Sequence, residues 1–229
     1  MPEFSDEEIA LFERVVKTRR SVRGFLDRPV PQTTLEAIFD LARWSPSGTN
    51  QQPWHICVAS GKVRDAMRAE MMDRVANKVP IVTDHLPDGR VGGVYRDRKR
   101  ACAHVLYEAM DIQWEDKARR AAAYEKNYTL FDAPHAAFIC MDEVFGTQTA
   151  ADVGMFSQTL MLAMTAYGVA SCAQGTLRNY PDLVRETFSL PDEMKVLFGI
   201  SFGYEDASIP ANLARTQRAQ LDENIQFLG

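Results

Sequence analysis

The chain has 229 residues, of which 46% are hydrophobic and 25% are charged, as in an ordinary globular protein with a buried core. This length favours one domain, or one domain with a sizeable insertion. The net charge of −5 and a pI of about 5.4 argue against binding to nucleic acid or to an anionic membrane. Local arginines could still hold a small ligand that carries a phosphate.

The N-terminal segment is acidic and lacks the charged and apolar regions of a secretory signal. The longest apolar stretch, residues 155–170, contains polar side chains and is too short to cross a bilayer. These features predict a cytoplasmic protein that has no membrane partner.

Cysteine and histidine give no sign of a metal site. The four histidines are scattered, without the spacing of metal ligands. The cysteines form no CxxC pair and have apolar neighbours, which predicts buried, reduced thiols. They are Cys57, Cys102, Cys140 and Cys172.

Two capping boxes predict the first helices. Ser5 and Glu8 precede an apolar stripe that ends near residues 18–21, and Thr33 with Glu36 introduces a second stripe. The second helix is expected to stop at the Ser-Pro-Ser-Gly run of residues 45–48.

The middle of the chain alternates between strand and helix patterns. We expect a strand at 54–59, a charged helix at 62–78 and a surface loop at 80–93, followed by strong helix formers at 95–125. Residues 80–134 are the predicted insertion, and their irregular start suggests a mobile, lid-like segment.

The sequence patterns in the last third of the chain predict the strands and helices of a compact core. Strand patterns occur at 136–141, 169–173 and 195–203, and helix patterns at 149–167 and 181–188. The helix at 149–167 is apolar nearly all round, so we expect it in the core and at a subunit interface, with Gly168 ending it. No regular strand-helix-strand rhythm appears. The pattern favours an α+β fold, an α/β sandwich.

Three polar segments stand out as candidate sites. The first contains Arg19, Arg20, Ser21 and Arg23. Guanidinium groups bind phosphate bidentately and keep their charge. Equally, these cations could simply complement the negative end of the first helix.

The second segment lies between Trp44 and Trp54 and includes Pro46, Ser47, Gly48 and Asn50. Its amides and hydroxyls could bind a planar polar ring, although an ordinary turn has a similar composition. The third segment is Gln174-Gly175 at a strand end, where glycine permits close approach of a ligand to the backbone.

With RRSVRGF, PSGTNQQPWHI, SCAQGTLRNYPD and FGISFGYED in this order, the sequence resembles the FMN-dependent nitroreductases over essentially its whole length. The resemblance implies a central mixed, mainly antiparallel sheet flanked by helices. It also implies one FMN-binding domain over residues 1–229 and an intertwined homodimer with FMN clefts at the interface. Two features depart from the best-known members: Arg23 stands where many have lysine, and residues 80–134 are longer than in compact relatives.

Carried onto this chain, the motifs give each segment a role at the flavin. Ser21 and the arginines near it would hold the phosphate and ribityl chain, with Arg23 near the N1/O2 edge. The loop of the other subunit would line the ring, Gly175 would offer a backbone N–H near N5, and the tail would complete the phosphate site. The cofactor-binding residues implied are Arg19, Arg20, Ser21, Arg23, Pro46, Ser47, Gly48, Asn50, Gln174, Gly175, Arg215 and Arg218.

The implied activity is a ping-pong transfer of two electrons from NAD(P)H through flavin N5 to a nitroaromatic or quinone acceptor. No catalytic side chain is required, because the cofactor carries the chemistry. Tyr124, Tyr128 and Phe131 could stack on an aromatic acceptor, but packing of the insertion explains them as well. The alternatives are a relative that dehalogenates or consumes flavin, a non-catalytic flavin-binding protein, and a scaffold without flavin.

Overall fold

The computed structural model describes residues 3–86 and 89–229, and its centre is a sheet with the strand order β1-β2-β4-β3. All neighbouring strands are antiparallel. One parallel contact, the bridge between Ser21 and Ser171, adds the N-terminal segment to the edge at β3. The strands are β1 (Trp54–Ser60), β2 (His135–Asp142), β3 (Ala170–Gln174) and β4 (Met194–Gly203).

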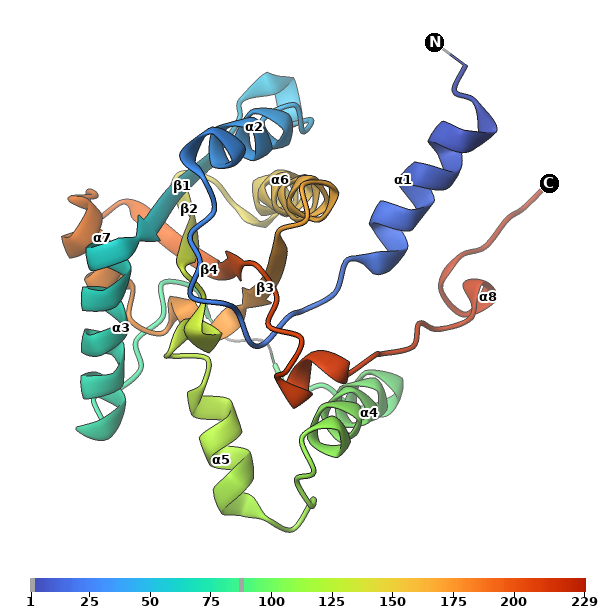
Figure 1. Cartoon of the computed structure of the whole chain (residues 1–229). Helices are drawn as coiled ribbons and strands as arrows, with labels where there is room; N and C mark the ends of the chain where they lie inside the picture. The colour runs from blue at the N-terminus through green and yellow to red at the C-terminus, as the bar shows by residue number, and fades with distance from the viewer. Residues whose placement is uncertain (1–2, 87–88) are drawn as a thin grey trace.

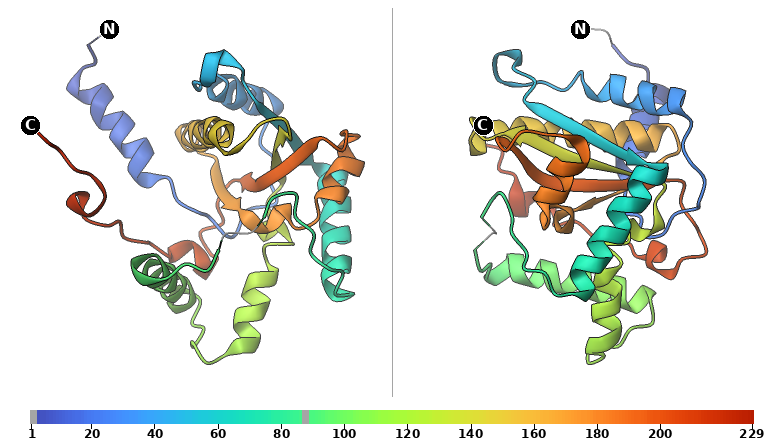
Figure 2. Two further views of the ribbon diagram at one scale, coloured as in Figure 1. Left: turned by 180° about the vertical axis from the view of Figure 1, so that it is seen from behind. Right: turned by 90° about the vertical axis from the view of Figure 1, so that its left-hand side faces the viewer.

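Helices cover both faces of this sheet (Figures 1 and 2). In β2, Ile139 packs with the core that α2 (Gln32–Ala42) and α6 (Thr147–Ala166) form. Its neighbour Phe138 points to the other face and packs with residues of α3 and α7. A strand buried on both faces is apolar throughout, which is why residues 136–141 lack alternation. The predicted α+β sandwich with a mainly antiparallel sheet is confirmed. The other two covering helices are α3 (Gly61–Ala76) and α7 (Pro181–Phe188).

The structure confirms the capping box predicted at Ser5 and contradicts the one predicted at Thr33. Before α1 (Asp6–Thr18), the Ser5 backbone N–H donates to the Glu8 carboxylate at 2.8 Å, and the Ser5 hydroxyl accepts the Glu8 N–H at 3.3 Å. Before α2 the cap is Pro31, and no side chain caps the helix. The Pro31 carbonyl already accepts the N–H groups of residues 34 and 35, so the predicted cap Thr33 lies inside the helix.

Helix α6 lies in the core, as predicted. Val153, Leu160 and Met164 are completely buried against the sheet. Gly168 follows the helix with φ +70°, a left-handed conformation that glycine adopts without steric penalty. Met155 on the outer side remains 41% exposed, and its place in a subunit interface stays a prediction.

Residues 80–134 contain helices α4 (Gly93–Ala109) and α5 (Lys117–Glu125), which project from the sheet layers (Figure 1). The start of this segment is not a free lid. The Asp84 residue is half-buried, and its carboxylate accepts hydrogen bonds from the Arg185 guanidinium and the Val196 backbone N–H, the shortest from each at 2.8 Å. Part of the predicted mobile loop is therefore held against α7 and β4. That residues 80–134 are an insertion stays a prediction.

Three of the four cysteines are buried and all four are free thiols, but Cys102 is exposed on α4. The prediction of a buried thiol was wrong there, because that side of α4 faces a cavity rather than the core. Within residues 3–86 and 89–229, no cluster of metal-ligating side chains occurs. In the same residues, no helix has the length and apolar character needed to cross a membrane.

Candidate functional site

A cavity of about 750 Å³ lies where the two ends of the chain meet. The end of α1, residues 19–23, one side of α4 and residues 214–218 of the C-terminal tail line it. Figures 1 and 2 show these segments, far apart in the sequence, surrounding one region beside the sheet. The arginines predicted from both chain ends therefore face a common space.

The lining of this cavity is strongly positive. It contains six cationic side chains and no carboxylate. Burial, and after it the positive charge of Arg218, lowers the pKa of the Arg19 guanidinium. Repulsion between cations that share a cavity favours an anion between them. The six are Lys17, Arg19, Arg20, Arg23, Arg215 and Arg218.

Most of these cations are available to a ligand. In the part of the chain that the structure describes, Arg19, Arg23, Arg215 and Arg218 form no ion pair. Arg215 and Arg218 instead donate to backbone carbonyls of the tail, at 2.7 Å and 3.2 Å. Such bonds fix where the guanidinium groups lie and leave their charge uncompensated.

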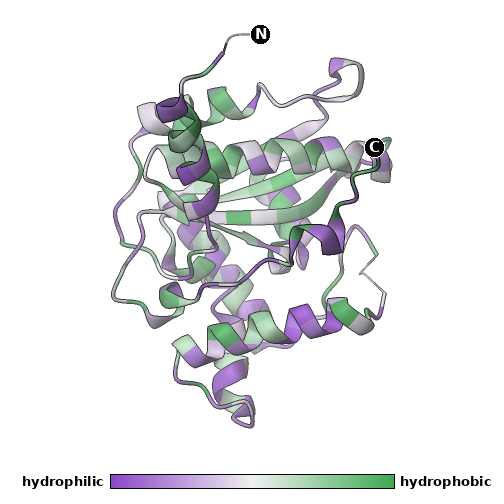
Figure 3. Ribbon diagram, turned by 90° about the vertical axis from the view of Figure 1, so that its right-hand side faces the viewer, coloured by the Kyte–Doolittle hydropathy of each residue, from purple (hydrophilic) through white to green (hydrophobic). Residues whose placement is uncertain are grey.

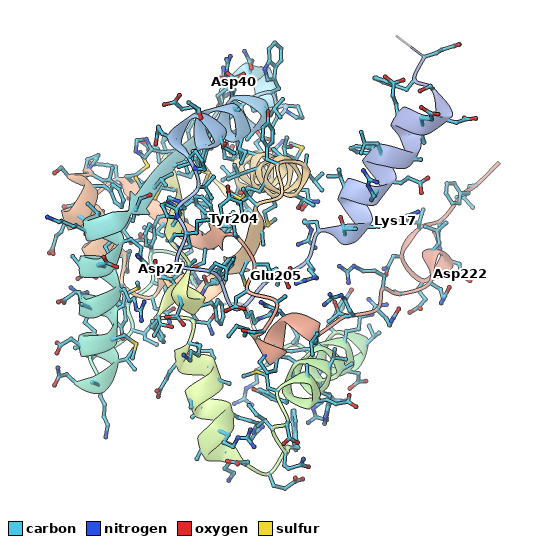
Figure 4. The ribbon with its side chains drawn as sticks, viewed as in Figure 1. Lys17, Asp27, Asp40, Tyr204, Glu205 and Asp222 are labelled. Carbon is cyan, nitrogen blue, oxygen red and sulfur yellow. The ribbon has the colours of Figure 1, made fainter. Side chains whose placement is uncertain are left out.

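Two of the six cations are paired: Lys17 with Glu13 of the same helix and, across the fold, Arg20. Its guanidinium binds the carboxylate of Glu205, which Figure 4 labels near the centre of the molecule. The pair joins the N-terminal segment to the chain after β4. We therefore assign Arg20 mainly to holding the segment, which the motif alone did not indicate.

The sheet edge sets the position of residues 19–23. After α1 ends, the Val22 backbone N–H donates to the Ser171 carbonyl at 3.0 Å, next to the bridge between Ser21 and Ser171. Arg19 is the C-cap of α1, whereas Arg20 and Arg23 lie on the extended segment beside β3. Complementing the helix end can therefore account for Arg19 but not for the other two arginines.

Asn212 fastens the tail to this segment and was not predicted. It is 2% exposed and lies in η4 (Pro210–Leu213). Its side-chain oxygen accepts the Arg23 N–H at 2.6 Å, and its amide donates to the Gly24 carbonyl at 2.9 Å. A β-carbon on Gly24 would lie 2.5 Å from Ile209, so only glycine permits this approach. Asn212 could not be predicted, because no sequence motif distinguishes a single asparagine in a polar tail.

Gln174 and Gly175 do not line the cavity. The Gln174 amide is buried and donates to the Asn127 carbonyl at 3.0 Å, while its oxygen accepts the hydroxyl of Ser201. Gly175, the first residue of η3 (Gly175–Arg178), is exposed and has open space where a β-carbon would stand. Of the two, the structure offers the backbone of Gly175 to a ligand.

The predicted loop of residues 46–50 also lies away from the cavity, next to α6. The Gly48 N–H donates to Asp152 at 2.9 Å, and the Ser47 hydroxyl accepts the N–H of Gln52 at 2.9 Å. Thr49 and Asn50, in η1 (Gly48–Asn50), have φ of 49° and 57°, a strained region for residues other than glycine. Trp44 beside the loop is 77% exposed.

The three aromatic residues proposed for the acceptor lie in different environments. Tyr128 is 3% exposed, and its hydroxyl accepts the Asn179 amide at 2.7 Å. Phe131 is 5% exposed, in η2 (Leu130–Asp132). Their burial favours the packing alternative. Tyr124 is 53% exposed on α5 and keeps a face that a ligand can reach.

The chain is thus an α+β sandwich with an antiparallel sheet and an arginine-lined cavity whose charge suits an anionic ligand. The model of the Nitroreductase family matches residues 16–204. The chain therefore belongs to the nitroreductase family, and the resemblance inferred from its motifs is confirmed.

Individual relatives cover nearly the whole chain. The nitroreductase NfnB of Mycolicibacterium smegmatis is 37% identical over 215 residues, which are 94% of this chain and 92% of the relative. The 4-nitrobenzoate reductase of Pseudomonas putida is 31% identical over 220 residues, 95% of this chain and 96% of that enzyme. The crystal structure of the FMN-dependent NfnB from Mycobacterium smegmatis in complex with NADPH matches with a TM-score of 0.92 at 35% identity, covering 97% of this chain and 100% of that one.

Proposed function

We propose that this protein is an FMN-dependent oxidoreductase that moves two electrons from NAD(P)H to a nitroaromatic or quinone acceptor. The observation that carries the proposal is the cavity with six cationic side chains and no carboxylate. Relatives that are themselves nitroreductases favour this activity over dehalogenation, flavin consumption or flavin binding without turnover.

The residues present fit FMN. A phosphate monoester carries nearly two negative charges and several acceptor oxygens. Arg19, Arg215 and Arg218 would neutralise this charge, and the Ser21 hydroxyl would donate to it. Arg23, fixed through its backbone by Asn212, would lie toward the N1/O2 edge of the ring.

When bound, FMN supplies the two-electron carrier that accepts hydride from NAD(P)H and returns it to an acceptor. The chain contributes binding, orientation and an electric field. A guanidinium at the N1/O2 edge stabilises negative charge there, and the backbone N–H of Gly175 would donate to the N5 edge. The two substrates would use one cleft in turn, which agrees with the lack of a dinucleotide-binding fingerprint in the sequence.

The site is completed, in this proposal, by a second copy of the chain. No residue of α1 is buried, and Figure 1 shows this helix standing clear of the sheet. Its apolar residues Leu11 and Phe12, on the ribbon that Figure 3 colours by hydropathy, are 51% and 63% exposed. The C-terminal tail is similar, with Phe227 82% exposed. A partner subunit would cover both segments and supply residues 46–50 to the ring. Sedimentation should show a dimer, and a monomeric holoprotein would contradict this arrangement.

Flavin content and reduction test the proposal directly. The purified protein should be yellow, and NADPH or NADH added without oxygen should bleach the flavin. Adding 4-nitrobenzoate should then restore the colour. A colourless protein that does not take up FMN would refute the cofactor, and bound flavin that neither dinucleotide bleaches would refute the reductase activity.

The aromatic acceptor is expected to reach the ring past Tyr124, the exposed member of the three aromatic residues. Tyr124→Ala should raise the KM for 4-nitrobenzoate and leave flavin content unchanged, whereas an unchanged KM would remove Tyr124 from the acceptor site. We expect neither a nucleic-acid nor a membrane partner, and a cytoplasmic location remains our prediction.

A further inference from the structure

One face of α4 continues from the cavity to the protein surface. Cys102 and Leu106 line the cavity. With 3.6 residues per turn, the side chains three, four and seven positions before Cys102 lie on the same side of the helix. These are Lys99, Arg98 and Tyr95.

This face has two cations and an exposed aromatic ring. Lys99 is exposed and forms no ion pair within residues 3–86 and 89–229. Arg98 donates to Glu223 of α8 (Leu221–Asn224) at 2.9 Å, and Tyr95 is 67% exposed. By the same periodicity, Arg100 points to the opposite side of α4.

We propose that this face of α4 binds the adenosine end of NADPH, with Lys99 and Arg98 on the 2′-phosphate and Tyr95 against the base. The proposal rests on the function proposed above. In that function, the FMN phosphate binds the arginines of the cavity. The 2′-phosphate of NADPH therefore needs other cations. NADPH and NADH differ only in the 2′-phosphate, and Lys99 with Arg98 therefore favours NADPH.

Glu223 controls how much of this charge is available. Its carboxylate pairs with Arg98, and the 2′-phosphate would compete with it for this guanidinium. Glu223→Gln removes the competing carboxylate. It should therefore tighten binding of NADPH and leave binding of NADH unchanged, the opposite of the effect of removing Lys99.

The test compares Lys99→Gln with Arg100→Gln, which removes the same charge from the far side of the same helix. In Lys99→Gln, kcat/KM for NADPH should fall about tenfold, as expected for one lost charge-assisted contact, and kcat/KM for NADH should not change. Arg100→Gln should leave both values near those of the parent. Equal effects of the two substitutions, or an equal loss with both dinucleotides, would overturn the proposal.

A binding measurement separates this inference from the reductase activity itself. Adenosine 2′,5′-bisphosphate and AMP are titrated into the holoprotein by calorimetry. The bisphosphate should bind more tightly than AMP to the parent chain, and Lys99→Gln should reduce the difference about tenfold. If bisphosphate and AMP bind alike while NADH still bleaches the flavin, the proposed function stands and the assignment of Lys99 fails.

Discussion

The side-chain oxygen of Asn212 accepts the backbone N–H of Arg23 at 2.6 Å and so joins the C-terminal tail to the N-terminal arginine segment. The same side chain donates to the carbonyls of Gly24 and Asp206, each at 2.9 Å. The Arg215 guanidinium in turn donates to the Asn212 carbonyl at 2.7 Å. One buried amide thus positions cations that come from opposite ends of the chain.

Asn212→Ala should weaken FMN binding although Asn212 does not line the cavity. Its loss leaves the part-buried Arg23 N–H without its acceptor, which costs about 2 kcal/mol in the free energy of unfolding, whereas the Gly24 carbonyl keeps the Asp206 N–H as a donor. The looser segment should raise the Kd for FMN about tenfold. Flavin fluorescence and urea unfolding measure the two effects. Asn77→Ala is the control, because it removes an exposed hydrogen bond from a side-chain amide to a single carbonyl. It should change neither the Kd for FMN nor the free energy of unfolding.

Arg19→Ala should separate cofactor binding from stability. Arg19 is partly buried among other cations, so removing it relieves repulsion and should not destabilise the protein without cofactor. The same change removes a phosphate contact and should weaken FMN binding about 10- to 100-fold.

Riboflavin provides the control for the Arg19 prediction, because it lacks the phosphate. Its affinity should change much less than that of FMN. Arg43→Ala breaks an exposed pair with Asp40 and should leave both affinities as they are. An equal loss for riboflavin and FMN would place Arg19 away from the phosphate.

The sequence predicts best what depends on local patterns. The Ser5 capping box, the buried strand at 136–141 and the glycine that ends α6 each follow from neighbouring residues, and the structure has all three. The prediction for Thr33 failed because the N-cap is Pro31, two residues earlier. The Pro31 carbonyl accepts the first helical hydrogen bonds, so the helix starts before Thr33.

The arrangement of the site depends on contacts that no local pattern encodes. The motifs named arginines at both chain ends, but the cavity exists because Ser21 pairs with Ser171 and because Asn212 holds the tail. In the sequence, Glu205 and Lys17 are ordinary charged residues, and only the fold places them beside the arginines. Local sequence patterns do not encode such tertiary pairing.

Asp84→Asn should destabilise the fold through the segment before α4. The carboxylate is 8% exposed and paired with Arg185, and removing its charge leaves the guanidinium partly buried and unpaired. Loss of such a pair costs about 3 kcal/mol, measurable by urea unfolding. Asp182→Asn breaks a comparable but exposed pair with Arg74 and should cost less than about 1 kcal/mol. Similar losses in both variants would mean that Asp84 does not anchor the segment.

His135 should make the protein sensitive to acid. Its Nε2 accepts the Val30 N–H at 2.9 Å, so the proton lies on Nδ1, which contacts the Ser60 hydroxyl at 2.6 Å. Burial, and after it the positive charge of Arg64, lowers the pKa of His135 from 6.5 to about 4. The folded state therefore favours the neutral ring, while the unfolded chain takes up a proton below pH 6.5.

The free energy of unfolding should accordingly be highest above pH 6.5 and fall as the pH drops toward about 4, with the lost stability assigned to His135. Urea unfolding across this range measures the fall. His135→Gln keeps a side chain that can accept from Val30 but cannot titrate, so it should flatten the curve even if it lowers the whole profile. His55→Gln changes an exposed histidine and should keep the slope of the parent chain. If His135→Gln keeps that slope as well, another group is responsible for the acid sensitivity.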